Sequence, residues 1–418
     1  MSNSTTNTYT LKREILNFSN KISNMLTKPT RKFIADITYG MLAGSSCLLT
    51  DVVDQLHEKS KKVNIVERLA RHLNNGIPEE ALVSYYQTVC KWVPDEPVVH
   101  IDGSDIIKPN GHKFEALGRV RDGSKSSNTK NVYEKGYNVT EACVITRNNH
   151  PVSIFSRIHS PLEKDYTSAN TITFEAMKLG KDLFDKATFV MDRGYDDNKM
   201  FLKLDELEQD YVIRLTAKRK LFYRNKWVPA TELRNRRKGK IKMPVYYDGE
   251  SHDAYLSHVK VKITASRKNI YLVLIYGLSK HPMMLATNKE LKSKEDVVRI
   301  ARLYFSRWRI EEYFRSKKQI FQFENFRVRK LKAINALNFY ITMCMAFLTL
   351  ISMKSENSTL KTSILLTADS VKQNVRFHYY RLAKGIHGIL SYAKEGVRLW
   401  FKAKKRSKYR QLCFNLAA

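Results

Sequence analysis

The chain has 418 residues, of which 43% are hydrophobic, and its 73 Lys and Arg residues against 41 Asp and Glu residues give a formal net charge of +32. This hydrophobic content can bury cores for two or three domains, which excludes a disordered protein. The positive charge exceeds what solubility requires, so a polyanion is the expected partner, and nucleic acid fits better than a membrane.

The cysteines point to a reducing compartment. All five lie far apart in the sequence and none forms a C-x-x-C pair, which argues against cysteine-bound zinc and against a disulfide framework. The N-terminus is polar and lacks the apolar core of a secretory signal. We therefore expect the protein in the cytoplasm.

The first region, residues 1–94, has helical spacing and no alternating strand pattern. Residues 46–56 and 64–73 are two predicted amphipathic helices joined by a basic link. This pattern predicts a small helical DNA-binding domain, with contact carried mostly by charge.

The character of the sequence changes at residue 95, where short apolar strands begin. Residues 98–101 form a β-branched run that ends at Asp102, where we expect a buried strand to leave the sheet. A second short strand, 187–191, ends at Asp192. Between and after these strands the sequence predicts a hairpin (137–146 and 152–158), a helix (168–184), a helix ending at 208 and a strand (211–215). This order is that of an RNase H-like sheet, and we assign the catalytic core to residues 95–217 and 290–356.

Residues 218–289 predict strands separated by polar turns, with a basic run at 234–242. We interpret this segment as a β-rich insertion in the core. The core then resumes with a helix over about 295–321. The apolar run 333–353 is long enough to span a membrane, but it contains Asn335 and Asn338 and follows the preceding helix closely, so we predict a buried core helix and no membrane contact.

The C-terminal region, residues 357–418, is helical and increasingly basic. Its end, 398–410, interleaves basic and aromatic residues, which suits nucleic-acid binding. A solvated helix with a frayed cationic end explains the same pattern equally well.

The helix over 304–318 carries the most informative pattern in the chain. At about 100° per residue, Tyr304, Arg307, Glu311 and Lys318 fall within roughly 60° of one another, whereas Glu312 points about 100° away from Glu311. A carboxylate can bind a metal ion, the two cations can bind phosphate oxygens, and the phenol can donate a hydrogen bond. Charged helix faces are common, so an ordinary amphipathic surface helix is the alternative.

The two strand-end aspartates make this pattern more specific. Asp102, Asp192 and Glu311 together would form an oxygen ligand set that favours Mg²⁺ or Mn²⁺. Two such ions activate a water or 3′-hydroxyl on one side of a phosphorus atom and stabilise the leaving oxygen on the other. This is the chemistry of nucleases and strand transfer.

These residues also carry a resemblance to a known family. The spacing Y-x2-R-x3-E-x6-K resembles the Tyr-Arg-Glu-Lys signature of the insertion-sequence-four family of DDE transposases, and Asp102 and Asp192 resemble the two aspartates of its DDE triad. The resemblance implies a transposase with an RNase H-like core and two metal ions held by Asp102, Asp192 and Glu311. It further implies a homodimer that synapses terminal inverted repeats of double-stranded DNA and joins them to target DNA by a cut-and-paste route through a hairpin, in the bacterial cytoplasm at the nucleoid. The residues expected to contact substrate DNA are Tyr304, Arg307, Lys318, Arg315, Arg193, Met283 and Trp227.

The sequence departs from the family pattern at one position. Some relatives have a tryptophan 28 residues before the glutamate, which stacks on a flipped base, and here that position is Met283. Trp227 is a possible substitute. Two other functions remain open: an RNase H-like nuclease without strand transfer, and a DNA-binding regulator descended from a transposase.

Overall fold

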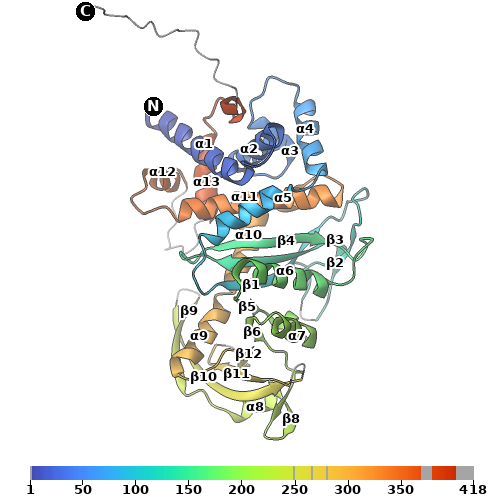
Figure 1. Ribbon diagram of the computed structural model, residues 1–418, viewed down its shortest axis with the longest axis vertical. Helices are drawn as coiled ribbons and strands as arrows, with labels where there is room; N and C mark the ends of the chain where they lie inside the picture. The colour runs from blue at the N-terminus through green and yellow to red at the C-terminus, as the bar shows by residue number, and fades with distance from the viewer. Residues whose placement is uncertain are drawn as a thin grey trace, which may run out of the picture.

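The computed structural model describes residues 2–127, 129–247, 250–264, 267–278, 281–368 and 379–401. The molecule is elongated, with helices at one end, a large sheet in the middle and the predicted insertion at the other end (Figure 1). Most of the basic end 398–410, for which nucleic-acid binding and a solvated cationic helix end were both open, lies beyond Phe401 and so outside the described residues.

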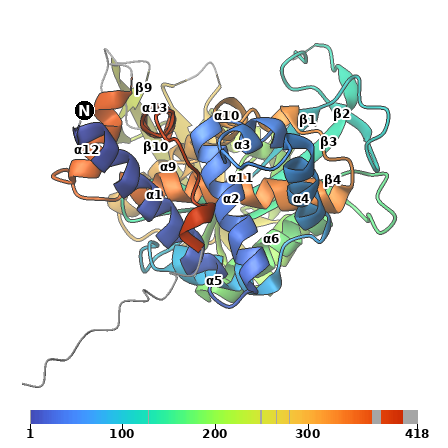
Figure 2. The same ribbon diagram turned by 90° about the horizontal axis from the view of Figure 1, so that it is seen from above.

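The region 1–94 is helical. Its helices are α1 (Ser2–Ser23), α2 (Lys28–Gly44), α3 (Leu49–Asp54), α4 (Lys62–Asn74) and α5 (Glu79–Cys90). In α4 the buried residues Ile65, Leu69 and Leu73 recur every four positions, which gives the helix one apolar stripe. Seen from above, α1 and α2 lie across α11 (Leu331–Ser352) (Figure 2).

An ion-pair cluster joins the two ends of the chain. Asp36 on α2 is fully buried and pairs with Arg68 on α4 and with Arg398 on η3 (Arg398–Phe401). Glu58 pairs with the same two arginines. The C-terminal helices α12 (Thr359–Thr367) and α13 (Tyr379–Leu390) therefore belong to the same helical end of the molecule as α1–α5.

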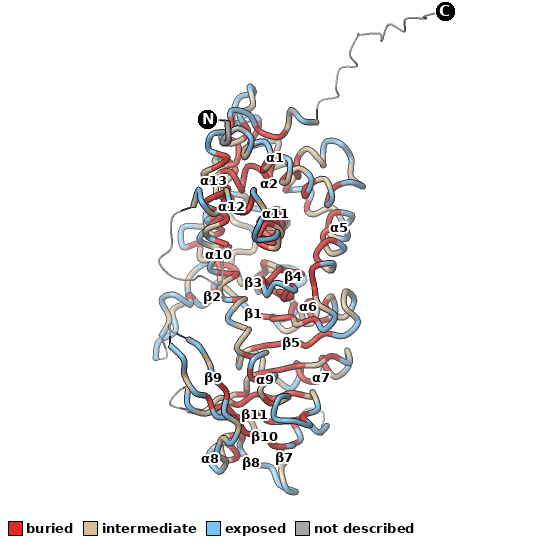
Figure 3. The backbone as a smooth tube through the Cα atoms, turned by 90° about the vertical axis from the view of Figure 1, so that its left-hand side faces the viewer, coloured by how far each residue is buried: buried red, intermediate tan, exposed pale blue. Residues whose placement is uncertain are grey.

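Twelve strands of the described residues form one mixed sheet, in the order β2-β3-β1-β5-β6-β12-β11-β10-β7-β8, with β4 paired to β3 and β9 to β10. The strands and helices of its first half are β1 (Val98–Ile107), β2 (Gly118–Arg121), β3 (Tyr133–Ile145), β4 (Pro151–His159), α6 (Ala169–Phe184), β5 (Thr188–Met191), α7 (Asn198–Glu206) and β6 (Asp210–Arg214). The predicted order of strand, hairpin, helix, strand, helix and strand is present, with β2 as an additional short strand. β3, β4, β5 and α11 are mostly buried (Figure 3).

The prediction that a strand ends at Asp102 is wrong. β1 continues through Asp102 to Ile107, because the long strand β3 pairs with it over that whole length, from Val99 opposite Val144 to Ile107 opposite Gly136. Only the parallel pairing with β5 stops before Asp102. Asp102 therefore lies within a strand, at the point where one of its two neighbours ends.

The predicted insertion continues the same sheet. Its elements are β7 (Lys220–Tyr223), β8 (Lys226–Pro229), α8 (Ala230–Arg236), β9 (Ile241–Tyr247), β10 (Glu250–Ile263), β11 (Asn269–Tyr276) and β12 (Met283–Thr287). β12 pairs antiparallel with β6, Leu285 opposite Arg214, so the added strands lengthen the sheet at the edge that β6 would otherwise leave open.

The two faces of the sheet carry different helices. Along β5, Phe189 and Met191 pack in the core that includes Phe201 of α7, whereas Val190 packs in a second core with Val297 of α9 (Lys294–Phe305). This alternation is that of a strand buried on both faces. α6 and α7 thus cover one face, and α9 covers the other.

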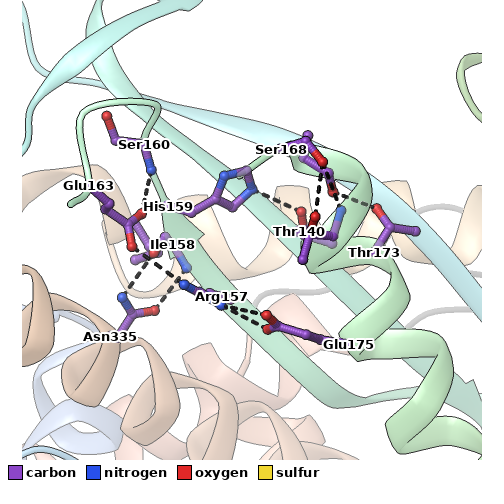
Figure 4. A network of polar contacts seen from close by, with 12 residues as sticks. Thr140, Arg157, Ile158, His159, Ser160, Glu163, Ser168, Thr173, Glu175 and Asn335 are labelled. Atoms are coloured by element: carbon purple, nitrogen blue, oxygen red, sulfur yellow. Dashed lines mark hydrogen bonds and ion pairs between the residues drawn. The ribbon is translucent and has the colours of Figure 1, made fainter. Parts of the chain in front are cut away.

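α11 is the buried core helix predicted for residues 333–353. It is long and apolar enough to cross a membrane by composition, but 89% of its most apolar window is buried inside the protein. Asn335 pairs with the backbone of β4: its side-chain amide donates to the Ile158 carbonyl oxygen (2.9 Å) and its side-chain oxygen accepts from the Ile158 N–H (2.8 Å) (Figure 4). The asparagine therefore serves as a hydrogen-bond partner for the strand.

Candidate active site

Strand register places the two aspartates side by side. β1 and β5 run parallel with Ile101 opposite Met191, so Asp102 is the next residue on β1 and Asp192 directly follows the last residue of β5. Neighbouring strands lie about 4.8 Å apart. Side chains alternate between faces, so both aspartates lie on the same face as Val190, which α9 covers.

The expected continuous helix over 295–321 is interrupted. α9 ends at Phe305 and α10 (Trp308–Ile320) begins after a tight turn at Ser306 and Arg307. Here the N–H groups of Arg307, Arg309 and Ile310 bond three residues back, as in a 3₁₀ turn, and the Ser306 hydroxyl donates to the Leu303 carbonyl oxygen (2.7 Å). The prediction of one unbroken helix face is therefore wrong.

Arg307 connects two of the three predicted acids. Its Nη1 donates to Asp102 Oδ2 (2.7 Å), and its Nη2 donates to Glu311 Oε1. The Glu311 side chain is 51% exposed, against 22% for that of Asp102, so the site opens to solvent on the side of the glutamate. The single positive charge of Arg307 is thus shared between the two carboxylates.

Asp192 has its own partners. The Tyr304 hydroxyl donates to its Oδ1 (2.8 Å), and Arg214 at the end of β6 lies 3.6 Å from the same atom. Burial favours the protonated acid, but the Arg193 backbone N–H, the Tyr304 hydroxyl, Arg307 and Arg214 together outweigh it and lower the pKa of Asp192. Asp192 is therefore held as a carboxylate.

Asp102 is in the opposite situation. Burial raises its pKa to about 6, although Arg307 and the Gly103 backbone N–H, which donates to Asp102 Oδ1 (2.9 Å), favour the charged form. Glu311 and Asp192 also raise this pKa. An added cation would relieve both the burial cost and the mutual repulsion of the acids.

The other residues of α10 singled out in the sequence differ in how close their contacts lie to the acids. Lys318 pairs with Glu324 (3.0 Å) and with Asp105 of β1 (3.5 Å), three residues after Asp102. Glu312 pairs with Arg315 on the helix surface and does not join the aspartates. The choice of Glu311 over Glu312 thus agrees with their contacts.

The remaining predicted DNA contacts lie at different distances from the acids. Arg193 is exposed and directly follows Asp192. Met283 begins β12, next to β6, and packs beside the core that contains Tyr304. Trp227 lies on β8, the last strand of the sheet order and six strands from β5, where its ring contacts Phe222. The structure does not bring Trp227 to the acids.

Sequence reasoning missed a buried ion pair behind the site. Lys317 and Glu141 are both fully buried, with Nζ 3.1 Å from Glu141 Oε2, and Lys317 also donates to Ser156 and Thr342. Glu141 lies directly opposite Asp102 in the β1–β3 pairing. The signal was available, because Lys317 follows Ile310, Tyr313 and Phe314 at helical spacing and so falls on the apolar stripe.

It also missed His100 and Arg214. His100 lies on β1 two residues before Asp102, and its Nε2 is 2.9 Å from the Ser306 hydroxyl oxygen. Because that hydroxyl already donates to Leu303, the histidine is the donor. Arg214 could have been found from strand order, since it ends β6, the strand next to β5, and Asp192 directly follows β5.

The acids suit a hard divalent cation by their chemistry. All three offer carboxylate oxygens, and because burial raises the pKa of Asp102, a bound cation would stabilise its charged form. Within the described residues no three acidic, histidine or cysteine side chains already converge as a metal cluster. The ion would be held by Asp102, Asp192 and Glu311. Binding would require Arg307 to break at least one of its two hydrogen bonds to Asp102 and Glu311.

A comparison with protein families decides the affiliation. The family model described as "Transposase DDE domain" matches residues 94–347, well over half of the chain. The chain belongs to this transposase family. A search of curated proteins found no significant match.

The family assignment carries general consequences. It implies an enzyme of DNA transposition that binds DNA, and DDE transposases generally use divalent metal ions. The matched segment begins just before β1 and ends within α11, so it contains the three acids, Arg307 and the β-rich insertion of this DDE transposase domain.

Proposed function

We propose that this DDE transposase belongs to the insertion-sequence-four type, with an RNase H-like core, and that it cleaves DNA at element ends and joins the 3′-hydroxyl ends to target DNA. The observation that carries the proposal is the register of β1 and β5, which sets Asp102 beside Asp192 on the face where Arg307 connects Asp102 to Glu311. Asp102 and Asp192 thus lie next to each other, and Arg307, a cation that can bind phosphate, links Asp102 to Glu311.

Two Mg²⁺ or Mn²⁺ ions held by these acids would supply Lewis-acid stabilisation of the scissile phosphate. The side chains around them have separate tasks. Burial raises the pKa of Tyr304 to about 12, so its hydroxyl keeps its proton and donates to Asp192 or to a phosphate oxygen. Arg307 can exchange a carboxylate for a phosphate, since its planar fork suits both.

The order of steps also belongs to the proposal. We expect a cut-and-paste reaction in the bacterial cytoplasm, through a hairpin on the element end, carried out by a homodimer that holds two ends together. Lys318, Arg315 and Arg193 would contact element-end phosphates: the first two follow Glu311 on α10, and Arg193 directly follows Asp192. Met283 is the candidate to cover a flipped base.

One experiment separates this proposal from a nuclease and from a DNA-binding regulator. A supercoiled plasmid carrying the inverted repeats that flank the coding sequence is incubated with the protein and Mg²⁺, with chelator and with the Asp192→Asn variant as controls. We expect excision followed by joining to a second plasmid, with Mg²⁺ and the parental protein only. Cutting without joined products would favour the nuclease, and binding without cutting would favour the regulator.

A further inference from the structure

A basic groove runs along the outer side of α9. It has a volume of about 990 Å³ and lies between α9, the turn after β3 and the beginning of β9. In Figure 1, α9 and β9 lie side by side below β1, and residues of the two elements are in contact. The groove is separate from the cluster of acids, since none of Asp102, Asp192 and Glu311 lines it.

Its lining is strongly positive. Glu295 is the one acidic residue among the described residues that form it. The arginines and lysines of the lining come from three segments of the chain: Arg147, Lys240, Lys242, Lys294, Arg299 and Arg302. Arg309, at the start of α10, adds a seventh.

Three of these cations are available to a ligand. Arg147, Lys242 and Arg299 each form an ion pair with an acid of the protein. Lys240, Lys294 and Arg302 are exposed, and no ion pair is found for them within the described part of the chain. Positive charge without an internal partner favours an anionic ligand.

The groove leads to the acids. Ser306 lines it and is the residue before Arg307, which contacts Asp102 and Glu311. α9 has 12 residues and is therefore about 18 Å long. One strand of a duplex has a phosphate about every 3.4 Å along the duplex axis, so α9 lying parallel to that axis would span on the order of five phosphates.

An exposed aromatic side chain lies next to one of the lining residues. Tyr255 of β10 is opposite Lys242 of β9, so both side chains are on the same face of that strand pair, and Tyr255 is 41% exposed. An exposed ring beside a basic side chain is typical of nucleic-acid surfaces.

From these observations we propose that the α9 groove binds the phosphate backbone of the DNA segment that continues from the reacting phosphate. The proposal rests on the proposed function, because it takes DNA to be the substrate at the acids. It adds the path of the DNA: along α9 to the turn at Ser306, and from there to Arg307 and the carboxylates. The same backbone chemistry is offered by element-end DNA and by target DNA.

The test compares two triple variants with equal loss of charge. The groove variant is Lys240→Ala, Lys294→Ala and Arg302→Ala. The control variant is Lys164→Ala, Lys178→Ala and Lys199→Ala, three exposed positions: Lys164 in the loop before α6, Lys178 on α6 and Lys199 on α7, the helices on the opposite face of the sheet. Binding is measured against salt concentration, in the presence of chelator, with an element-end duplex and with a scrambled duplex of equal length.

The slope of log K against log salt is about 0.9 per phosphate contact, so we expect the groove variant to flatten it by roughly two to three and the control variant to change it much less. Flattening with the element-end duplex alone assigns the groove to the element end, and flattening with both assigns it to DNA of any sequence, including target. A slope no flatter than that of the control variant overturns the proposal. Because chelator prevents cleavage, this outcome is independent of whether the acids catalyse transposition.

Discussion

His100 donates from Nε2 to the hydroxyl oxygen of Ser306, over a distance of 2.9 Å. The contact joins the strand that carries Asp102 to the turn that carries Arg307. Burial, together with Arg309 and Arg307, lowers the pKa of His100 to about 3, so the ring stays neutral. His100 therefore acts as a positioning residue for the cation between the acids.

We expect His100→Leu to reduce cleavage about tenfold or more, because the turn loses its anchor and Arg307 loses its fixed position. DNA binding should be nearly unchanged. His100→Gln can donate a similar hydrogen bond and should restore part of the activity. Cleavage rates and binding constants of the two variants provide the measurement, and equal rates for both would show that the hydrogen bond has no positioning role.

The two neighbouring glutamates of α10 should differ sharply. Glu311→Ala is expected to abolish cleavage, as are Asp102→Ala and Asp192→Ala, while element-end binding persists, because these changes remove metal ligands rather than phosphate contacts. Glu312→Ala should be mild, since Glu312 pairs with Arg315 at the surface. A plasmid nicking assay with Mg²⁺ distinguishes them. Inactivation by Glu312→Ala with an active Glu311→Ala would reverse the assignment.

The adjacent lysines Lys317 and Lys318 should separate stability from DNA binding. Lys317→Met leaves Glu141 buried without a counter-charge, which typically costs about 3–5 kcal/mol of unfolding free energy. Adding Glu141→Gln should recover much of that loss. Lys318→Met should change stability little, because its side chain is 27% exposed and its pairs are near the surface, but it should weaken DNA binding.

Urea unfolding of the two single variants and the double variant gives the comparison. Two equally stable single variants would show that the buried pair contributes no more than the surface pair.

Asp36 should make stability depend on pH. Burial raises its pKa to about 6 from an ordinary value of 3.8, despite Arg398 and Arg68 beside it. The folded protein therefore binds this proton more tightly than the unfolded chain, so between pH 4 and 6 the contribution of Asp36 to stability falls as the pH rises. The fall should be on the order of 2–3 kcal/mol.

Asp36→Asn should remove this dependence. The quantity to measure is the difference in unfolding free energy between parental protein and variant from pH 4 to 7, because the difference cancels other titrating groups such as Asp102. A difference that is constant with pH would show that Asp36 titrates at its ordinary value.

The base-stacking candidates can now be ranked. Trp227 lies six strands from β5, so Trp227→Ala should leave hairpin formation at the parental rate. Met283 begins the strand next to β6. Stacking is worth about 1–3 kcal/mol per base, and a thioether covers a base less fully than a ring. Met283→Ala should therefore slow hairpin formation severalfold and leave the first nick unaffected. Met283→Trp should speed the step.

A gel that resolves nicked, hairpinned and reopened ends over time follows all three variants. A large effect of Trp227→Ala would mean that the insertion reaches the acids in the DNA complex. Parental rates of hairpin formation for all three would show that neither residue covers a flipped base, and a parental reaction without hairpinned ends would point to a route without a hairpin.

Local patterns in the sequence determined much of this protein. Short apolar runs gave β5 and the first part of β1, helical spacing gave α6, α9 and α11, and the acids and cations could be selected because their types suit phosphodiester chemistry. These features depend on neighbours within a few residues, which a sequence displays directly. The distinction between Glu311 and Glu312 also followed from helical geometry alone.

Tertiary structure decided what depends on partners distant in the chain. β1 continues past Asp102 because β3 pairs with it there, and the helix is interrupted at Ser306, where His100 and Asp102 of β1 hold Ser306 and Arg307. The insertion strands extend the sheet and place Trp227 far from the acids. Lys317 can be buried because it forms an ion pair with Glu141. Strand register and burial are set by contacts between residues tens to hundreds of positions apart, and the spacing of residues along the sequence does not encode which of them will meet.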